Sequence, residues 1–245
     1  MYEDDCYKNS DCTYWPKYET ADHYSDEQIR HFRKRYKALA TMTDAYIGKL
    51  LDVLDRNNMW DDTAVIFTTD HGFMLGEHGF MAKCVMPDYN EVFHIPLMVH
   101  IPKIESARVT ALTQNIDLFP TILELFDVDL SLCKNKLHGK SLLPLICGKQ
   151  TRIHDKLLFG VYAKTVNVTD GRYVYMRKAI NKDNQPLYIY GSMMSILNKY
   201  IGHDTMDSKN FEHIEMGRFL SWTNYPVYKV PTEYVYWGNY CLEFS

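Results

Sequence analysis

The sequence predicts an α/β fold in which a mixed sheet is flanked by helices and followed by a small C-terminal antiparallel α+β subdomain. Three observations lead to this prediction. A long helical pattern immediately precedes a short apolar run, a second apolar run follows, and from Leu157 onward strand-like segments alternate with turn residues. We therefore expect two domains, over residues 1–155 and 156–245.

The first predicted element is a helix that begins after Ser25. Ser25 and Gln28 have the spacing of a capping box, and the two acidic residues between them suit the first helical turn. Mostly apolar side chains then recur at intervals of three and four residues, the pattern of one helix face. The members of this stripe are Ile29, Phe32, Tyr36, Leu39, Thr43, Tyr46, Leu50 and Leu54. The pattern ends at residues 56–58, whereas residues 1–24 lack periodicity and predict a loop.

Two strands and a second helix are expected next. Residues 63–69 are mostly β-branched or aromatic and uncharged, so they predict a buried strand that ends at Asp70. Residues 95–101 predict a second strand, with prolines at its entrance and just beyond its end. Asp117 has the position of an N-cap for a helix over 118–126, and residues 131–152 predict a loop.

The predicted C-terminal subdomain contains strands over residues 157–162, 172–177 and 187–190. Turn residues at 170–171 and 181–184 separate these strands, so antiparallel neighbours are expected. Aromatic residues make up 14% of the chain, and 19 of them are Tyr. This enrichment favours β-structure, and either sheet packing or a surface for sugars explains it.

Composition excludes several classes of protein. The chain has 245 residues, is 46% hydrophobic, and has a formal net charge of −4, so a basic nucleic-acid-binding surface is not expected. Apolar runs are too short to span a bilayer, and the acidic N-terminus lacks the features of a signal peptide, which leaves the localisation open. The six cysteines form no Cys-x-x-Cys pair; Cys6 and Cys12 could form a local disulfide, but free thiols are favoured.

The candidate site follows the first predicted strand. Asp70 and His71 stand at its carboxyl end, where ligands gather in α/β sheets, and together they form half of a metal site. A carboxylate suits Ca²⁺ or Mg²⁺, whereas an imidazole is more usual with Zn²⁺ or Mn²⁺. Lys83 follows a glycine-framed loop and could hold an anion against that metal. A turn-capping role for Asp70 and a solvated position for Lys83 are the alternatives.

Residues 36–145 resemble the C-terminal half of a sulfatase catalytic domain, in the alkaline phosphatase superfamily. The central pieces are Asp70-His71-Gly72 and the loop from Gly76-Glu77-His78-Gly79 to Lys83. Around them, residues 36–51 resemble the long helix before the metal strand, 60–72 the metal strand, 94–97 and 116–121 the next strand and helix, and 138–142 the family's Gly-x-Ser-Leu segment. All pieces occur in the family's order.

The resemblance implies a metal-dependent hydrolase of sulfuric esters that acts on a sulfated small molecule or glycan. It implies that Asp70 and His71 bind a divalent metal, most often calcium, and that Lys83 contacts the sulfate. The family's nucleophile is a formylglycine made in a Cys/Ser-x-Pro-x-Arg motif, which this sequence lacks; Cys84-Val85-Met86-Pro87 does not match it. We therefore assign no catalytic residue.

The missing motif predicts that the chain is a fragment and is inactive alone. A half-domain would expose apolar surface, which favours self-association or pairing with a missing N-terminal half. Two other functions stay open. One is a phosphodiesterase, phosphonate hydrolase or phosphoglycerol transferase of the same superfamily, and the other is an inactive binding or oligomerising remnant.

Overall fold

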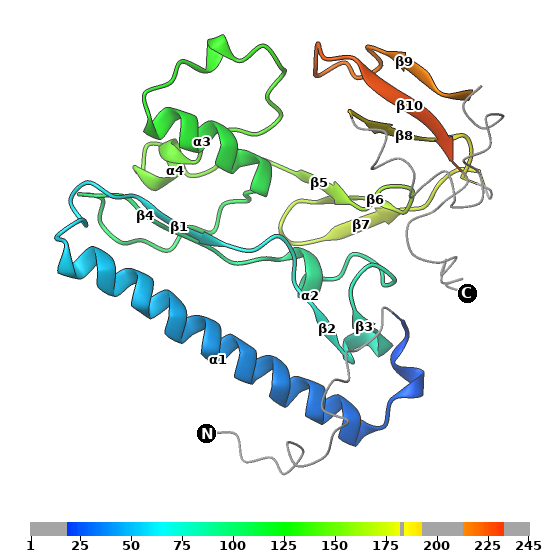
Figure 1. Ribbon diagram of the computed structural model, residues 1–245, viewed down its shortest axis with the longest axis horizontal. Helices are drawn as coiled ribbons and strands as arrows, with labels where there is room; N and C mark the ends of the chain where they lie inside the picture. The colour runs from blue at the N-terminus through cyan, green and yellow to red at the C-terminus, as the bar shows by residue number, and fades with distance from the viewer. Residues whose placement is uncertain (1–18, 182–183, 193–212, 233–245) are drawn as a thin grey trace. The chain divides into compact units, whose positions relative to one another are not determined.

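The computed structural model describes residues 19–181, 184–192 and 213–232. The chain forms two compact units; Ala107 ends the first along the described residues and Arg108 begins the second. Figure 1 shows both units. Cys6 and Cys12, with most of the predicted N-terminal loop, lie outside the described residues. The predicted domain boundary at residue 155 falls inside unit 2 and stays a prediction.

Unit 1 begins with a short 3-10 turn, Ala21–His23, and the long helix α1, Asp26–Arg56. The predicted capping box is confirmed: Gln28 N donates to Ser25 Oγ over 3.2 Å, and Ser25 N donates to Gln28 Oε1 over 2.8 Å. Phe32 is buried and meets the ring of Tyr24 edge-on at 5.4 Å between centroids. Within the described part of the chain, no helix is long and apolar enough to cross a membrane.

The two predicted strands of unit 1 are confirmed, in shorter form. β1, Val65–Thr68, pairs antiparallel with β4, Leu97–His100, so that Thr68 lies opposite Leu97. Every residue of β1 is only half-buried, whereas a buried strand was expected. Because the described residues place only β4 beside β1, this strand has one neighbour to cover its backbone.

The segment between β1 and β4, expected to be a loop, contains short ordered elements and the core of unit 1. They are β2, Met74–Leu75, a 3-10 turn at Glu77–Gly79, β3, Met81–Ala82, and the one-turn helix α2, Asn90–Phe93. β2 and β3 form a two-residue hairpin ladder. Five buried side chains gather here: Met74, Phe80, Val85, Met86 and Val92. Apolar burial therefore holds the chain on both sides of Lys83.

Unit 2 contains three short helical elements before α4. They are the 3-10 turn η4, Asn115–Asp117, the helix α3, Leu118–Leu125, and the 3-10 turn η5, Leu130–Leu132. α3 confirms the helix predicted over 118–126, with Pro120 in its first turn. The loop predicted over 131–152 is wrong in part, because Leu143–Ile146 form α4 with Pro144 near its start.

Two three-stranded antiparallel sheets complete unit 2. In the first, β5, Leu157–Gly160, β6, Val166–Thr169, and β7, Val174–Arg177, lie in the order β5-β6-β7. In the second, β8, Leu187–Gly191, β10, Val227–Thr232, and β9, Glu215–Gly217, lie in the order β8-β10-β9. β6 was not predicted, because Asn167 interrupts its apolar pattern; that side chain is fully buried and donates to Phe159 O over 3.2 Å.

The helices and sheets of the two units confirm the α/β class. All strand pairs among the described residues are antiparallel. Unit 2 contains two antiparallel sheets, where the sequence predicted one small antiparallel subdomain.

Candidate active site

His71 lies directly beyond β1, and its contacts define which nitrogen carries a hydrogen. Nδ1 is 2.8 Å from the carbonyl oxygen of Gly72. A carbonyl oxygen only accepts, so Nδ1 donates, and in the neutral ring Nε2 carries the lone pair. Histidines that bind metals commonly donate their other ring N–H to a backbone carbonyl in this way. Nε2 is therefore prepared as an acceptor or ligand.

Asp70 presents its carboxylate to the same place. Oδ2 is 3.2 Å from His71 Nε2, and Oδ1 accepts from the backbone N of His71 over 3.0 Å. The side chain is 81% exposed. Desolvation raises the pKa of Asp70, but the electrostatic interaction with His71 and the hydrogen bonds from neighbouring backbone and Thr69 outweigh it, so this pKa lies below its usual value. Asp70 is an anion at neutral pH.

Lys83 reaches the other side of the imidazole. Its Nζ is 2.5 Å from His71 Nε2, so the ammonium donates to the lone pair of that nitrogen. The backbone around Lys83 is unusual, because Ala82 and Cys84 both adopt positive φ, 61° and 80°. Left-handed backbone at residues other than glycine costs energy and is found most often at functional sites. Ala82 is fully buried, so the core of unit 1 maintains this conformation.

Gly72 is required for this arrangement by close approach rather than by its φ angle. A Cβ atom at Gly72 would lie 1.9 Å from the carbonyl oxygen of Glu91. Its N–H donates to Val92 O over 2.8 Å, and the next N–H, of Phe73, donates to Glu91 O over 3.2 Å. The chain that leaves the site is thus held against α2.

Glu77 and His78, which could have joined the site, have other partners. Glu77 Oε1 contacts Arg33 Nη2 of α1 over 3.1 Å, and Glu77 Oε2 accepts from Leu75 N over 2.5 Å. His78 stacks on the ring of Tyr89 with centroids 4.1 Å apart. Both side chains fix the conformation of the loop that leads to Lys83.

Asp70 and His71 fit a divalent cation as part of its coordination shell. Their donor atoms, an anionic oxygen and an imidazole nitrogen, are 3.2 Å apart and both partly exposed, so one ion could contact both. Among the described residues, no group of three or more His, Cys, Asp or Glu side chains is arranged to hold a metal. A calcium ion takes about six to eight oxygen ligands, so this pair supplies a minority of them.

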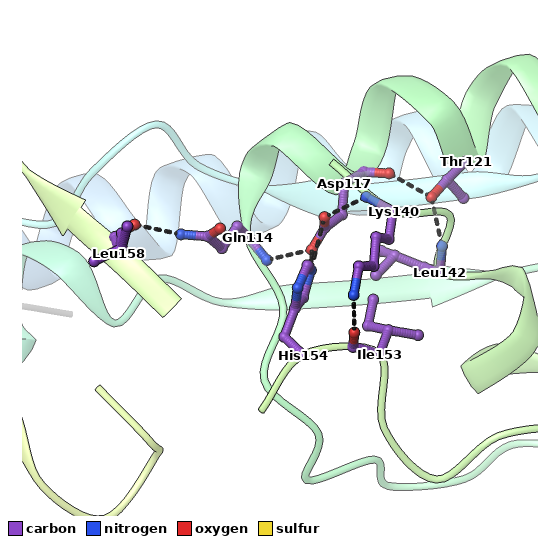
Figure 2. Close-up of polar contacts among 8 residues, drawn as sticks. All are labelled: Gln114, Asp117, Thr121, Lys140, Leu142, Ile153, His154 and Leu158. Carbon is purple, nitrogen blue, oxygen red and sulfur yellow. Dashed lines mark hydrogen bonds and ion pairs between the residues drawn. The ribbon is translucent and has the colours of Figure 1, made fainter. Parts of the chain in front are cut away.

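A second polar cluster lies in unit 2 and was not predicted as such. Figure 2 shows the carboxylate of Asp117 at its centre. Both of its oxygens are 3.0 Å from His154 Nε2, and each also accepts one backbone N–H over 2.8 Å, from Lys140 at Oδ1 and from Gln114 at Oδ2. The N-cap role expected for Asp117 is wrong in detail, because its side chain bonds no N–H of α3 and instead closes the turn η4.

The Asp117 cluster is structural rather than catalytic. Asp117 is fully buried, and the four in-chain contacts occupy the acceptor sites of its carboxylate. Lys140 Nζ donates to Ile153 O over 2.7 Å, and Thr121 Oγ1 links Asp117 O with Leu142 N (Figure 2). The cluster therefore ties residues 138–142 to the start of α3. His154 and Gln114 were not anticipated, because a lone histidine or glutamine in a loop follows no pattern that indicates its contacts.

The chain is similar to several known proteins. The family profile described as Sulfatase matches residues 4–128, and that described as N-sulphoglucosamine sulphohydrolase, C-terminal, matches residues 76–188. The chain is 30% identical to a choline-sulfatase of Rhizobium meliloti over 65% of its own length and 31% of that protein. It is 34% identical to arylsulfatase K of Rattus norvegicus over 50% of its length and 21% of that protein.

A solved structure is also similar. The structure of BT4656 in complex with its substrate D-glucosamine-2-N,6-O-disulfate has a TM-score of 0.52 and 25% identity, over 61% of this chain and 33% of that one. The chain thus spans about a third or less of the length of these relatives. The sulfatase family typically uses a divalent metal. Because the family profile covers half of the sequence, the chain belongs to the sulfatase family.

Proposed function

We propose that unit 1 carries the sulfate-binding part of a sulfatase active site and that the protein acts in sulfuric ester hydrolysis. The observation that carries this proposal is the meeting of three groups at one imidazole nitrogen. Lys83 Nζ and Asp70 Oδ2 lie 2.5 and 3.2 Å from His71 Nε2. A site of this kind offers a cation to an anionic group beside two metal-ligating side chains.

Each residue has one role in this proposal. Lys83 holds a sulfate oxygen through its ammonium, and the strained backbone on both of its sides orients it. Asp70 and His71 hold the divalent cation, and His71 is kept in the required tautomer by Gly72 O. A bound divalent cation supplies positive charge that neutralises the sulfate and activates a nucleophile. We propose calcium because Asp70 offers a hard, anionic oxygen.

The proposed substrate is a sulfated small molecule or glycan. Support comes from relatives whose names specify choline sulfate and aryl sulfate chemistry, and from a structural neighbour that holds a disulfated glucosamine. The lysine is a point charge that fits a tetrahedral anion without selecting the group attached to it. The identity of the ester group therefore depends on residues outside this cluster.

The test is titration calorimetry of the 245-residue chain with an aryl sulfate in the presence of calcium. We expect Lys83→Ala to weaken sulfate binding, because it removes the only proposed cationic side chain, and Lys37→Ala, an exposed lysine on α1, to leave it unchanged. Equal affinity of wild type and Lys83→Ala would contradict the proposal. Tighter binding of an aryl phosphate diester than of the sulfate would favour a superfamily phosphodiesterase instead.

Turnover is a separate measurement. We expect the 245-residue chain to hydrolyse no aryl sulfate, because the sequence contains no Cys/Ser-x-Pro-x-Arg motif and binding an anion does not by itself lower the barrier to its hydrolysis. Turnover that disappears in Asp70→Ala would show that the chain carries an unrecognised nucleophile.

A further inference from the structure

Unit 2 contains a cleft of about 680 Å³. None of the residues proposed to bind sulfate and metal, Asp70, His71 and Lys83 (the sulfate-binding cluster), lines it. This volume lies within the range of small-molecule sites, about 300–1,000 Å³. Its walls come from the segment after β5, from β8, from residues 220–222 and from the start of β10. The side chains that matter for its chemistry are Tyr162, Tyr188, Tyr190, Leu220, Trp222 and Val227.

Strand geometry brings two of the tyrosines to one face of the sheet β8-β10-β9. Tyr188 and Tyr190 are two residues apart on β8, so their side chains share a face, and Tyr190 lies opposite Lys229 of β10. The other face of β10 is buried, with Val230 only 3% exposed. The Val230 side of β10 is therefore covered, and Tyr188 and Tyr190 lie on the opposite face of the sheet.

The aromatic rings of the cleft are accessible. Tyr162 is 44% exposed, Tyr190 39% and Trp222 45%. The ring of Tyr162 is also oriented, because its hydroxyl donates to Tyr188 O over 2.9 Å. Burial is the main cause that raises the pKa of Tyr162 above its usual value. Large amphipathic rings in fixed orientations are suited to ligands that are apolar on one side and polar at the edge.

The charges beside the cleft decide between two classes of ligand. Aromatic cages bind quaternary ammonium ions, but here Lys229 Nζ already lies 4.4 Å above the ring of Tyr188 and 5.3 Å from that of Phe219. A second cation would be repelled from the ring of Tyr188, which an ammonium already contacts. Lys229 Nζ is in turn paired with Glu215 Oε1 over 3.0 Å, so the wall offers no net charge to an anion. A neutral ligand is left, and the tyrosine hydroxyls of the lining can exchange hydrogen bonds with it.

We propose that this cleft is a carbohydrate-binding site that takes a neutral pyranose ring of gluco configuration. In such a ring all hydroxyl groups are equatorial, so the axial C–H groups form apolar faces that stack on Trp222 and Tyr190. The hydroxyl groups at the ring edge meet the tyrosine hydroxyls of the lining. The site goes beyond the proposed sulfate chemistry and is independent of it, because it lies wholly within unit 2.

The test uses the full 245-residue chain and cellotriose, an uncharged oligomer of glucose, in titration calorimetry and tryptophan fluorescence. We expect saturable binding that Trp222→Ala and Tyr190→Ala each weaken by about tenfold or more, as truncation of a buried aromatic anchor does. Trp222→Phe keeps an aromatic face and retains most of the affinity. Tyr175→Ala removes an exposed tyrosine of β7 outside the cleft and leaves the affinity unchanged.

Circular dichroism and thermal unfolding of each variant show whether a loss of binding comes from loss of the site or from loss of the fold. Trp222→Phe is a further control, because it keeps an aromatic ring in the wall of the cleft. Three results would overturn the proposal: no saturable binding of cellotriose to the wild type, equal affinity in folded Trp222→Ala, or displacement of cellotriose by tetramethylammonium. Loss of cellotriose binding in Lys83→Ala, with Trp222→Ala unaffected, would place the sugar at the sulfate-binding cluster and would also overturn it.

Discussion

At the scale of single residues, the orientation of His71 depends on one carbonyl group. Because Gly72 O receives the hydrogen of Nδ1, Nε2 has only its lone pair to offer, and both Lys83 and a metal ion can use it. The same nitrogen cannot receive both at once. A lysine variant should therefore alter metal binding as well as anion binding, which links the two functions proposed for unit 1.

Calcium binding by Asp70 is the first prediction at this scale. We expect titration calorimetry of the wild-type chain to show weak binding of calcium or none, because two side chains supply a minority of the ligands that this ion takes. Asp70→Ala should abolish whatever binding is measured, and Asp62→Ala, a neighbouring exposed aspartate, should not change it. Tight binding that persists in Asp70→Ala would place the metal elsewhere.

The Asp117 cluster provides a second residue-scale prediction. Asp117→Asn removes a buried carboxylate that two backbone N–H groups and His154 share, so we expect the free energy of unfolding to fall by about 3 kcal/mol or more. Asp155→Asn, in an exposed ion pair with Arg152, should change it by less than about 1 kcal/mol. Chemical denaturation followed by circular dichroism measures both. Equal effects would show that the buried cluster contributes no more than a surface pair.

At the scale of elements, α1 combines a well-made N-terminus with a mostly uncovered apolar stripe. Phe32 in the second turn is buried at 5% exposure, but Leu39, Tyr46 and Leu50 are 52%, 58% and 69% exposed. A helix in a folded protein gains most of its stability from packing of its apolar face against the rest of the chain. The cap and the burial of Phe32 therefore stabilise the first turns of α1. The later turns have few apolar contacts to stabilise them.

The capping box is expected to contribute measurably. Ser25→Ala removes the acceptor of the Gln28 N–H and should lower the free energy of unfolding by about 1 kcal/mol. Ser25→Asp, which keeps a capping oxygen, should restore most of it. Thr41→Ala in the middle of α1 serves as the control, since its hydroxyl only bonds back to Lys37 O within the helix. No difference between Ser25→Ala and Thr41→Ala would contradict the role of the cap.

At the scale of the whole molecule, the exposed stripe of α1 favours association. Soluble monomers rarely present a contiguous apolar patch of this kind, and the stripe includes Tyr36 and Leu39 as well as Tyr46 and Leu50. We expect sedimentation velocity to show concentration-dependent self-association of the 245-residue chain. The double variant Leu39→Glu with Leu50→Glu should shift the chain toward monomer, and Lys37→Glu should not. A wild-type chain that stays monomeric at all concentrations would contradict this prediction.

The sequence predicted α1, β1 and β4 of unit 1. The capping box of Ser25, the strand before Asp70 and the strand after Pro96 were all anticipated, because their signals are short-range: a hydrogen-bond spacing, a β-branched run and a missing N–H. β2, β3 and α2 of unit 1 were not predicted, nor were β6, β9, β10 and α4 of unit 2. Most of these are short elements that depend on contacts with neighbours in space rather than on a local pattern. Asn167 is an example, because only the adjacent strand explains a buried amide there.

For the candidate site, the sequence by itself determined the residue types and their order: a carboxylate and an imidazole after a strand, and a lysine after a glycine-framed loop. Only the tertiary structure decided that Lys83 Nζ donates to Nε2 of His71 and that Glu77 pairs with Arg33. It also decided that the carboxylate of Asp117 accepts hydrogen bonds from three separate segments. Such contacts join residues that lie far apart along the chain, and their geometry is selected by burial of the surrounding core, a property that no local pattern encodes.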